Sequence, residues 1–248
     1  MEIWQIIVLA LVGIAAGWLN VMAGGGSLLT VPVMLFMGIP GPVANGTNRI
    51  AILAQNITAV TAFRKQGFSD FRLSLSLAAA ASVGALSGAS VGVRLEGEWF
   101  DRVLALVMIA VMILMATGRD KTRPVGGEAK AKNLLLGHVL MIGAGFWGGF
   151  IQIGVGFILM PILHRVMGLD LVRVNMHKVF VVLVYTVVAL AVFASQLELL
   201  WWTGAALAVG NSIGGWFGAH TTVKHGENLI RRVLYLALSV FIVKLLFF

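Results

Sequence analysis

Two polar stretches of this sequence lie within apolar surroundings and combine a basic side chain with hydrogen-bonding neighbours. The first is "VANGTNRIAI" at residues 43–52, which holds Asn45, Thr47, Asn48 and Arg49. The second is "LDLVRVNMHKVFVVL" at residues 169–183, which holds Asn175, His177 and Lys178. A fixed cation surrounded by amide groups is suited to binding an oxyanion through charge-assisted hydrogen bonds. We therefore expect these stretches to line an anion site.

The acidic residues favour an anion over a cation. All 10 fall in predicted loops or at the ends of apolar segments: Glu2, Asp70, Glu96, Glu98, Asp101, Asp120, Glu128, Asp170, Glu198 and Glu227. Ionisable groups are costly in lipid and, where tolerated, mark substrate or ion pathways. A cation carrier would be expected to hold a carboxylate in mid-membrane, and this sequence offers none. Two alternatives stay open: Arg49 as a snorkelling interface residue, and Lys178 as a charged anchor at the inner surface.

A glycine-rich run precedes each polar stretch. "AGGGS" at 23–27 contains Gly24, Gly25 and Gly26, and "IGVGF" at 153–157 follows Gln152. Glycine lets the backbone leave helical geometry, and a helix that begins at mid-depth presents unpaired N–H groups and the positive end of its dipole. We expect two such helix starts to converge near the membrane midplane and to donate hydrogen bonds to an anion. Close helix packing or a simple turn is the alternative for each run.

Helical spacing adds a polar partner to each cation. Arg49 and Asn56 are seven residues apart and share a helix face, as do Lys178 and Tyr185. The predicted substrate-binding residues are therefore Gly24, Gly25, Gly26, Asn45, Thr47, Asn48, Arg49, Asn56, Gln152, Asn175, His177, Lys178 and Tyr185.

Composition indicates which elements must position these residues. The 248 residues are 59% hydrophobic and 11% charged, whereas an ordinary soluble domain has about 25% charged residues. Apolar stretches long enough to cross a hydrocarbon core about 30 Å thick recur along the chain. The sequence predicts an all-α polytopic membrane protein with ten apolar elements, of which the second and seventh are short for a full crossing. They span roughly residues 3–22, 26–38, 49–63, 73–93, 100–117, 134–150, 152–167, 178–194, 200–220 and 229–247.

The two halves of the chain resemble each other. Each has a glycine-rich run, a proline, a glycine and a polar stretch that opens on asparagine, and glycines at 84, 88 and 92 are matched by glycines at 210, 214 and 218. These small-residue ladders favour close helix packing. Since five crossings are an odd number, two five-element copies predict an inverted-topology repeat with broken or re-entrant glycine-rich helices. The predicted domains are residues 1–117, a basic cytoplasmic linker at 118–133, and residues 134–248.

The register between the two copies is left open by the sequence. Aligning Gly38 with Gly168 places Asn48 opposite Lys178. A one-residue gap would place Arg49 there instead.

Basic residues predict the topology. With the N-terminus outside, fourteen of the 18 Lys and Arg residues fall in inner loops: Arg64, Lys65, Arg72, Arg119, Lys121, Arg123, Lys130, Lys132, Arg165, Arg173, Lys178, Lys224, Arg231 and Arg232. This bias follows the positive-inside rule and predicts a multi-pass protein of the bacterial inner membrane with both termini outside. It also explains the net charge of +8 without nucleic acid as a partner.

Catalysis is not expected from these residues. The chain has no cysteine, which excludes disulfides and thiolate chemistry. No Ser or Thr is arranged with a base and an orienting acid, and a phosphate-binding "GKS" or "GKT" is missing. The sequence therefore predicts neither an enzyme nor a bound cofactor or metal, and leaves the oligomeric state open, with a homodimer as one option.

The run "AGGGSLLTVPVMLFMGIPGPVANGTNRIA", together with "LDLVRVNMHKVFVVL", resembles the TauE/SafE family of membrane proteins, described as sulfite and organosulfonate exporters. The similarity extends over nearly the whole chain. It implies that Gly24 to Gly26 and Asn45 to Arg49 line an anion pathway, with Asn175, His177 and Lys178 opposite. The chain departs from the family pattern at Arg49, where the family often has lysine, and in the more apolar "GFWGGFIQIGVGF" of the second half.

Together these features predict a secondary transporter that exports a small anion, such as sulfite or sulfoacetate, by alternating access. A passive anion channel is the first alternative. A membrane subunit that scaffolds a soluble enzyme through its basic inner loops is the second.

Overall fold

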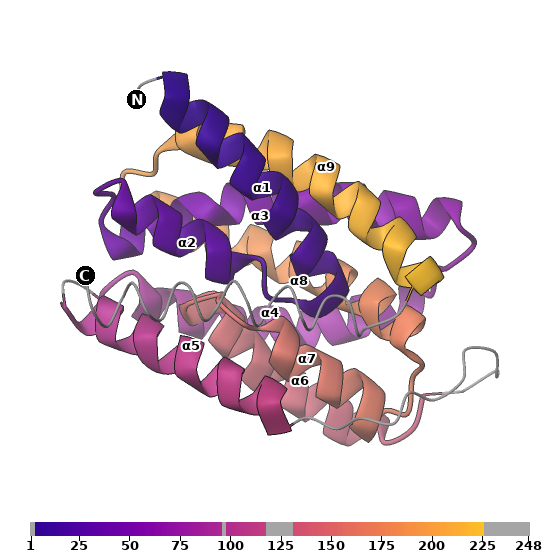
Figure 1. The fold of residues 1–248 in the computed structure, drawn as a ribbon. Helices are drawn as coiled ribbons and strands as arrows, with labels where there is room; N and C mark the ends of the chain where they lie inside the picture. Colours follow the sequence, from indigo (N-terminus) through magenta and orange to yellow (C-terminus); the bar gives the residue numbers. More distant parts are fainter. Residues whose placement is uncertain (1–2, 96–97, 118–130, 226–248) are drawn as a thin grey trace.

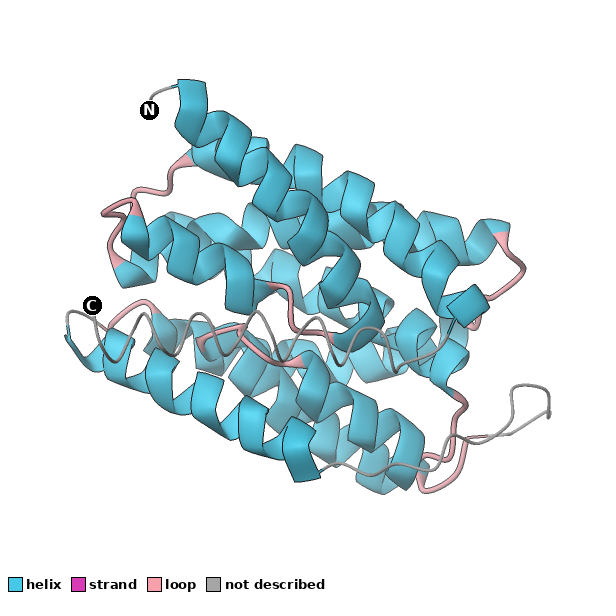
Figure 2. Ribbon diagram, viewed as in Figure 1, coloured by secondary structure: helices cyan, strands magenta, loops and turns pink. Residues whose placement is uncertain are grey.

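The computed structural model describes residues 3–95, 98–117 and 131–225. In these ranges the chain forms helices joined by short loops, with no strand (Figure 2). The helices are α1 (Ile3–Ala23), α2 (Ser27–Phe36), α3 (Gly41–Lys65), α4 (Phe71–Gly92), α5 (Glu98–Thr117), α6 (Leu134–Phe150), α7 (Gly156–Pro161), the π-helical turn η1 (Ile162–Val166), α8 (Leu171–Gln196) and α9 (Trp201–His225). The predicted tenth element at 229–247 and linker residues 118–130 lie outside the described residues.

A helical hairpin opens the described chain. Helix α1 ends at Ala23, Gly24 turns the chain with a positive φ of 79°, and α2 starts at Ser27. The start of α2 packs on the last turns of α1, because a Cβ at Gly26 would meet the carbonyl of Ala16. Figure 1 shows α2 running back toward the end of the molecule where α1 begins. With 10 residues, α2 is about 15 Å long and covers about half of a membrane.

The second half contains a hairpin of the same kind, made of α6, α7 and η1. Gln152 and Gly154, with positive φ of 64° and 70°, turn the chain after α6. The returning segment ends beside the start of α6, where the Lys132 N–H donates to the Met167 carbonyl at 2.9 Å and the Asn133 side chain donates to Val166 at 3.0 Å. The prediction that the second and seventh elements are short is confirmed by the helix lengths: α2 has 10 residues, and α7 and η1 have 6 and 5.

Glycine ladders join each hairpin to a long helix of the opposite half. A Cβ at Gly84 or Gly88 of α4 would meet backbone of Ile142 or Phe146 in α6. In the same way, glycines 210 and 214 of α9 lie against backbone atoms of α1. Helix α1 therefore packs along α9 and α6 along α4, with α3 and α8 between them (Figure 1). The predicted packing role of these glycines is confirmed.

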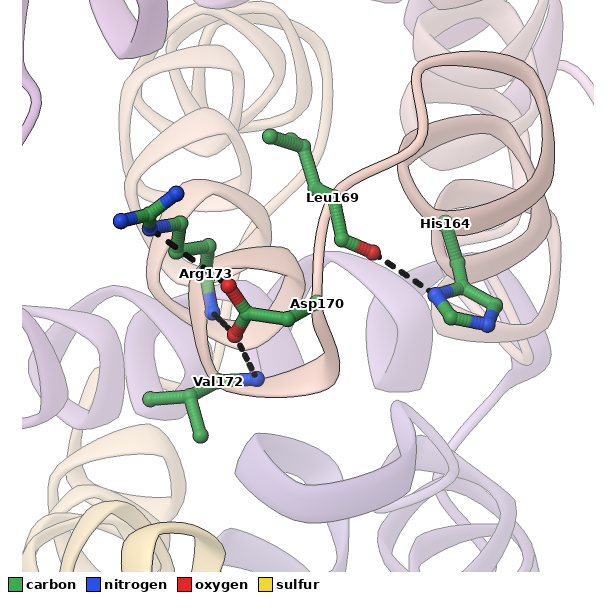
Figure 3. Close-up of polar contacts among 5 residues, drawn as sticks. All are labelled: His164, Leu169, Asp170, Val172 and Arg173. Atoms are coloured by element: carbon green, nitrogen blue, oxygen red, sulfur yellow. Dashed lines mark hydrogen bonds and ion pairs between the residues drawn. The ribbon is translucent and has the colours of Figure 1, made fainter. Parts of the chain in front are cut away.

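The predicted starts of three elements are wrong. The third element begins at Gly41 instead of residue 49, because Pro40 provides an extended N-cap and a proline in the first turn has no N–H to lose. The eighth begins at Leu171 instead of residue 178, because the Asp170 carboxylate caps the N–H groups of Val172 and Arg173 at 3.1 and 3.0 Å (Figure 3). Both polar stretches are thus the first turns of long helices.

The start of the seventh element is displaced in the other direction. It was expected at residue 152, but α7 begins at Gly156. The intervening residues cannot be helical, because Gln152 and Gly154 have positive φ. Just before α8, the His164 ring contacts the Leu169 carbonyl through Nδ1 at 2.7 Å and fixes the turn that follows η1 (Figure 3).

The outer surface of the bundle is apolar. Helices α1, α4 and α8 are long and apolar enough to cross a membrane. Large apolar side chains that face outward include Ile3, Leu135 and Trp202, which are 78%, 81% and 88% exposed. A water-soluble monomer rarely exposes apolar surface on this scale. Lipid is the environment that such a surface requires.

Candidate functional site

The breaks of the two hairpins touch each other inside the molecule. A Cβ on Gly24 would overlap the Cα of Gly156, and a Cβ on Gly156 would overlap the Cα of Gly24. All residues from Gly24 to Ser27 are buried. The N–H groups of Gly25, Gly26 and Ser27 donate to no backbone carbonyl within the described ranges. The start of α2 therefore presents free backbone donors where the two halves meet.

Arg49 and Asn45 of α3 hold the end of α6, an arrangement called here the first clamp. Arg49 Nη1 donates to the Gly148 carbonyl at 2.9 Å, and its Nη2 donates to the Gly149 carbonyl. Asn45 Nδ2 donates to the Phe150 carbonyl at 3.0 Å. A cation at a helix C-terminus is stabilised by the negative end of the dipole and by the unpaired carbonyls. The guanidinium is fully buried, at 0% exposure.

Lys178 and Asn175 of α8 hold the end of α1 in the corresponding way and form the second clamp. Lys178 Nζ donates to the Val21 carbonyl at 2.7 Å, and Asn175 Nδ2 donates to the Met22 carbonyl at 3.2 Å. Each half of the chain thus supplies an asparagine and a cation that bind the last carbonyls of the broken helix in the other half.

The two polar stretches can be compared by their distance from the start of their helices. Asn45 and Asn175 each lie four residues after the start of their helix, at Gly41 and Leu171. The corresponding alignment without a gap places Asn48 opposite Lys178. Arg49 therefore reaches the α6 carbonyls from the next position along its helix.

Asn48 of α3 binds α2, the short helix of the first hairpin. Its Oδ1 accepts from the Thr30 hydroxyl at 2.7 Å, and its Nδ2 donates to Ser27 Oγ at 3.1 Å. Sequence reasoning missed Ser27 and Thr30, although Ser27 directly follows the glycine run and Thr30 is three residues further on the same helix face. Asn48, which directly precedes Arg49, thereby links the start of α2 to α3.

Gln152 and Tyr185 complete the surroundings of Arg49. Gln152 Oε1 accepts from Arg49 Nη1 at 3.4 Å. Tyr185 is fully buried, and its ring packs over Gly148, where a Cβ would meet the hydroxyl oxygen. The guanidinium lies 4.4 Å from the centre of the Phe193 ring, a cation–π contact that the sequence did not reveal. Among the described carboxylates, none is within ion-pair distance of Arg49.

The remaining predicted residues lie apart from this cluster. Asn56 Nδ2 donates to the Ile52 carbonyl of its own helix at 2.8 Å. Thr47 Oγ1 accepts from the Leu200 N–H at 3.2 Å, in the loop between α8 and α9. His177 Nδ1 is 2.8 Å from Ser74 Oγ at the start of α4.

His177 borders a cavity at the basic end of the bundle. The cavity has a volume of about 760 Å³ and is lined by the α3–α4 loop and by residues that include Leu134, Arg173 and His177. A neighbouring cavity of about 330 Å³ is lined by residues that include Phe63, Ser69 and Met176. Three loops flank these cavities: the α3–α4 loop, the segment before α6 and the loop before α8. All three were predicted to face the inner side of the membrane.

The sequence that forms these hairpins and clamps can be compared with known proteins. The family model described as "Sulfite exporter TauE/SafE" matches residues 9–245. This chain belongs to the TauE/SafE family. The match spans both hairpins and both clamps, so the resemblance seen in the two polar stretches extends over the whole fold.

Curated relatives of this TauE/SafE member carry the name probable membrane transporter protein. It is 24% identical over 231 residues to a "Probable membrane transporter protein ORF9" of Sinorhizobium sp., with 93% of this chain and 88% of the relative covered. It is 25% identical over 247 residues to the "Probable membrane transporter protein YfcA" of Escherichia coli K12, with 97% and 89% covered. The comparison with solved structures finds no match. Family and relatives identify the chain as a multi-pass membrane transporter.

Proposed function

We propose that this TauE/SafE member is a secondary carrier that exports a small anion, sulfite or an organosulfonate such as sulfoacetate, across the bacterial cytoplasmic membrane. One observation carries the proposal: the buried guanidinium of Arg49 and the free N–H groups of α2 gather where the two hairpin breaks meet. Helix starts and a guanidinium both favour an oxyanion.

Several predicted residues keep a role in this proposal. Arg49 and Lys178 supply the positive potential, and Gly24 to Gly26 supply backbone donors. The hydrogen-bonding side chains along the proposed anion pathway are Asn45, Thr47, Asn48, Asn56, Gln152, Asn175, His177 and Tyr185. Of these, Asn45, Asn48, Gln152 and Tyr185 contact Arg49, its neighbours or the end of α6 in the structure.

An inverted repeat of residues 1–117 and 134–248, joined by the linker at 118–133, is part of the proposal. The matching contacts support it: Asn45 binds the Phe150 carbonyl as Asn175 binds the Met22 carbonyl. The paired packing of α1 with α9 and of α6 with α4 is what a twofold axis in the membrane plane would produce.

Alternating access is supported by a difference between the two ends of the bundle. At one end, Leu199 is 7% exposed and packs over Gly46, where a Cβ would meet its Cδ2 at 2.6 Å. At the other end, Ser69 is exposed and borders the 330 Å³ cavity. We propose that the basic end faces the cytoplasm, with both termini outside, and that this conformation is open inward.

The membrane potential would drive export in this arrangement. A cytoplasm that is negative inside favours outward movement of an anion by about 2.3 kcal/mol per charge per 100 mV. Export driven by the membrane potential therefore does not require a carboxylate site for a coupling cation.

Flux into proteoliposomes tests the carrier. The purified full-length chain is expected to move labelled sulfite or sulfoacetate with saturation and to show counterflow when one side is preloaded with unlabelled anion. Ion currents far above carrier rates, without saturation, would identify a channel instead. Charge reversal within residues 119–132 that abolishes function while Arg49→Ala does not would favour the scaffold alternative.

Single cysteines test the orientation and the access state, since the native chain has no cysteine. A cysteine at Ser69 is expected to react with a membrane-impermeant maleimide about tenfold faster than a cysteine at Leu199, when reagent is present on both sides. Reagent on the cytoplasmic side alone is expected to reach Ser69→Cys. Equal rates at the two positions, or labelling of Ser69→Cys only from outside, would contradict the proposed orientation or state.

A further inference from the structure

The two clamps are alike in their backbone contacts but differ in how their side chains are satisfied. In the second clamp, Asn175 Oδ1 accepts from Lys178 Nζ at 2.6 Å. In the first clamp, Asn45 Oδ1 accepts no hydrogen bond and Arg49 Nε donates none within the described ranges. Both residues are 0% exposed. The second clamp is internally closed, whereas the first leaves one acceptor and one donor unused.

A third unused group belongs to Tyr185. Its hydroxyl is buried near Arg49 and Gln152, yet no partner satisfies hydrogen-bond geometry with it among the described residues. The hydroxyl adjoins Gly148, whose carbonyl binds Arg49. Buried polar groups are nearly always paired, so three unpaired ones around one helix end require an explanation.

The backbone beside them has an unusual conformation. Gln152 has a φ of 64°, and it is one of two described non-glycine residues with positive φ. Such conformations are unfavourable for a side chain and persist where the surrounding structure demands them, often at ligand sites. The Gln152 side chain consequently lies against Arg49 instead of continuing along α6.

From these observations we infer that the anion binds at the first clamp, against Asn45 Oδ1, Arg49 Nε and the Tyr185 hydroxyl, and that it carries an O–H or N–H besides its acceptor oxygens. Arg49 Nε and the Tyr185 hydroxyl donate to the anionic group. Asn45 Oδ1 accepts from the ligand. The class that fits is a hydroxy- or amino-substituted sulfonate, or an oxyanion that keeps one proton.

This inference rests on the proposed function and narrows it. Lys178 contributes charge from the end of α1, while its Nζ stays bound to Val21 and Asn175. The direct contacts to the ligand are then made at one clamp only. An acceptor such as Asn45 Oδ1 disfavours a fully deprotonated anion, because the two would approach without a proton between them.

Two sulfonates of similar size provide the test. 2-Hydroxyethanesulfonate and ethanesulfonate differ by one hydroxyl group, and their binding to the purified full-length chain in detergent can be measured by calorimetry. The wild type is expected to bind the hydroxyl compound about tenfold more tightly. Asn45→Ala is expected to abolish that preference. Asn211→Ala removes another buried asparagine whose Oδ1 is unpaired among the described residues, and it is expected to lower the melting temperature while keeping the preference.

A second pair of variants tests the hydroxyl donor without disturbing the fold. Tyr185→Phe is expected to weaken both sulfonates about fivefold, and Thr186→Val, which removes the adjacent buried and unpaired hydroxyl, is expected to change neither. Thr186 points about 100° away around α8. If an alanine variant does not fold, this pair decides the question.

Equal binding of the two sulfonates by the wild type, a preference that survives Asn45→Ala, or unchanged binding in Tyr185→Phe would overturn the inference. In each of these cases an anion still binds, so the proposed carrier stands. Wild-type protein that neither binds nor moves any of these anions would instead refute the proposed function.

Discussion

Replacing Arg49 with alanine is expected to abolish anion transport and to lower the free energy of unfolding by about 3 kcal/mol or more, since each buried acceptor left unpaired costs about 1–3 kcal/mol. The carbonyls of Gly148 and Gly149 would both lose their donor, and Phe193 would lose its cation. Arg49 is 0% exposed, so these bonds are not in contact with bulk solvent. Flux in proteoliposomes and thermal unfolding in detergent measure the two effects.

Arg102 provides the matched control. It is an exposed arginine that forms an ion pair with Glu98 at 2.8 Å, one turn earlier in α5. Exposed pairs of this kind contribute about 0–1 kcal/mol. Arg102→Ala is therefore expected to leave transport unchanged. An Arg49→Ala protein that transports at the wild-type rate would refute the central role of this residue.

Gly24→Ala is expected to destabilise the protein by about 2–5 kcal/mol, the sum of a left-handed backbone penalty and an overpacked contact. Gly24 has a φ of 79°, and its added Cβ would overlap the Cα of Gly156. The two hairpins could then no longer meet. Thermal unfolding and the yield of monodisperse protein measure the loss.

Gly38→Ala separates the backbone penalty from the cost of the overpacked contact. Gly38 has nearly the same backbone, with a φ of 82°, but nothing lies within 4 Å of its added Cβ. Its substitution is expected to cost only about 1–2 kcal/mol, the backbone penalty alone. Equal losses in the two variants would mean that the contact between the hairpins does not matter for stability.

Local signals in the sequence predicted much of this architecture. Glycine runs predicted the breaks after α1 and α6, and apolar length predicted that α2 and α7 are short. Helix starts were predicted less well where capping decides them. The polar character of residues 41–48 suggested a loop, but two prolines and the stability of a buried helical backbone extend α3 through this stretch.

The partners of the two cations could not be predicted, because they lie far away along the chain. Arg49 binds a carbonyl 99 residues later, and Lys178 binds one 157 residues earlier. Backbone carbonyls carry no sequence signature, so a cation that caps a distant helix looks the same as one that awaits a ligand. Only the unpaired atoms of Asn45, Arg49 and Tyr185 distinguish these cases.

Each half of the chain binds the end of a helix in the other half, and this arrangement has a consequence for biosynthesis. The carbonyls of Val21 and Met22 are bound by Lys178 and Asn175, which the ribosome makes some 150 residues later. During that interval the first hairpin has a helix end with no cation to cap it. Its final geometry can be reached only after the nascent chain has inserted its second half. Completion of the N-terminal hairpin is thus a late event in assembly, although its residues are the first to be translated.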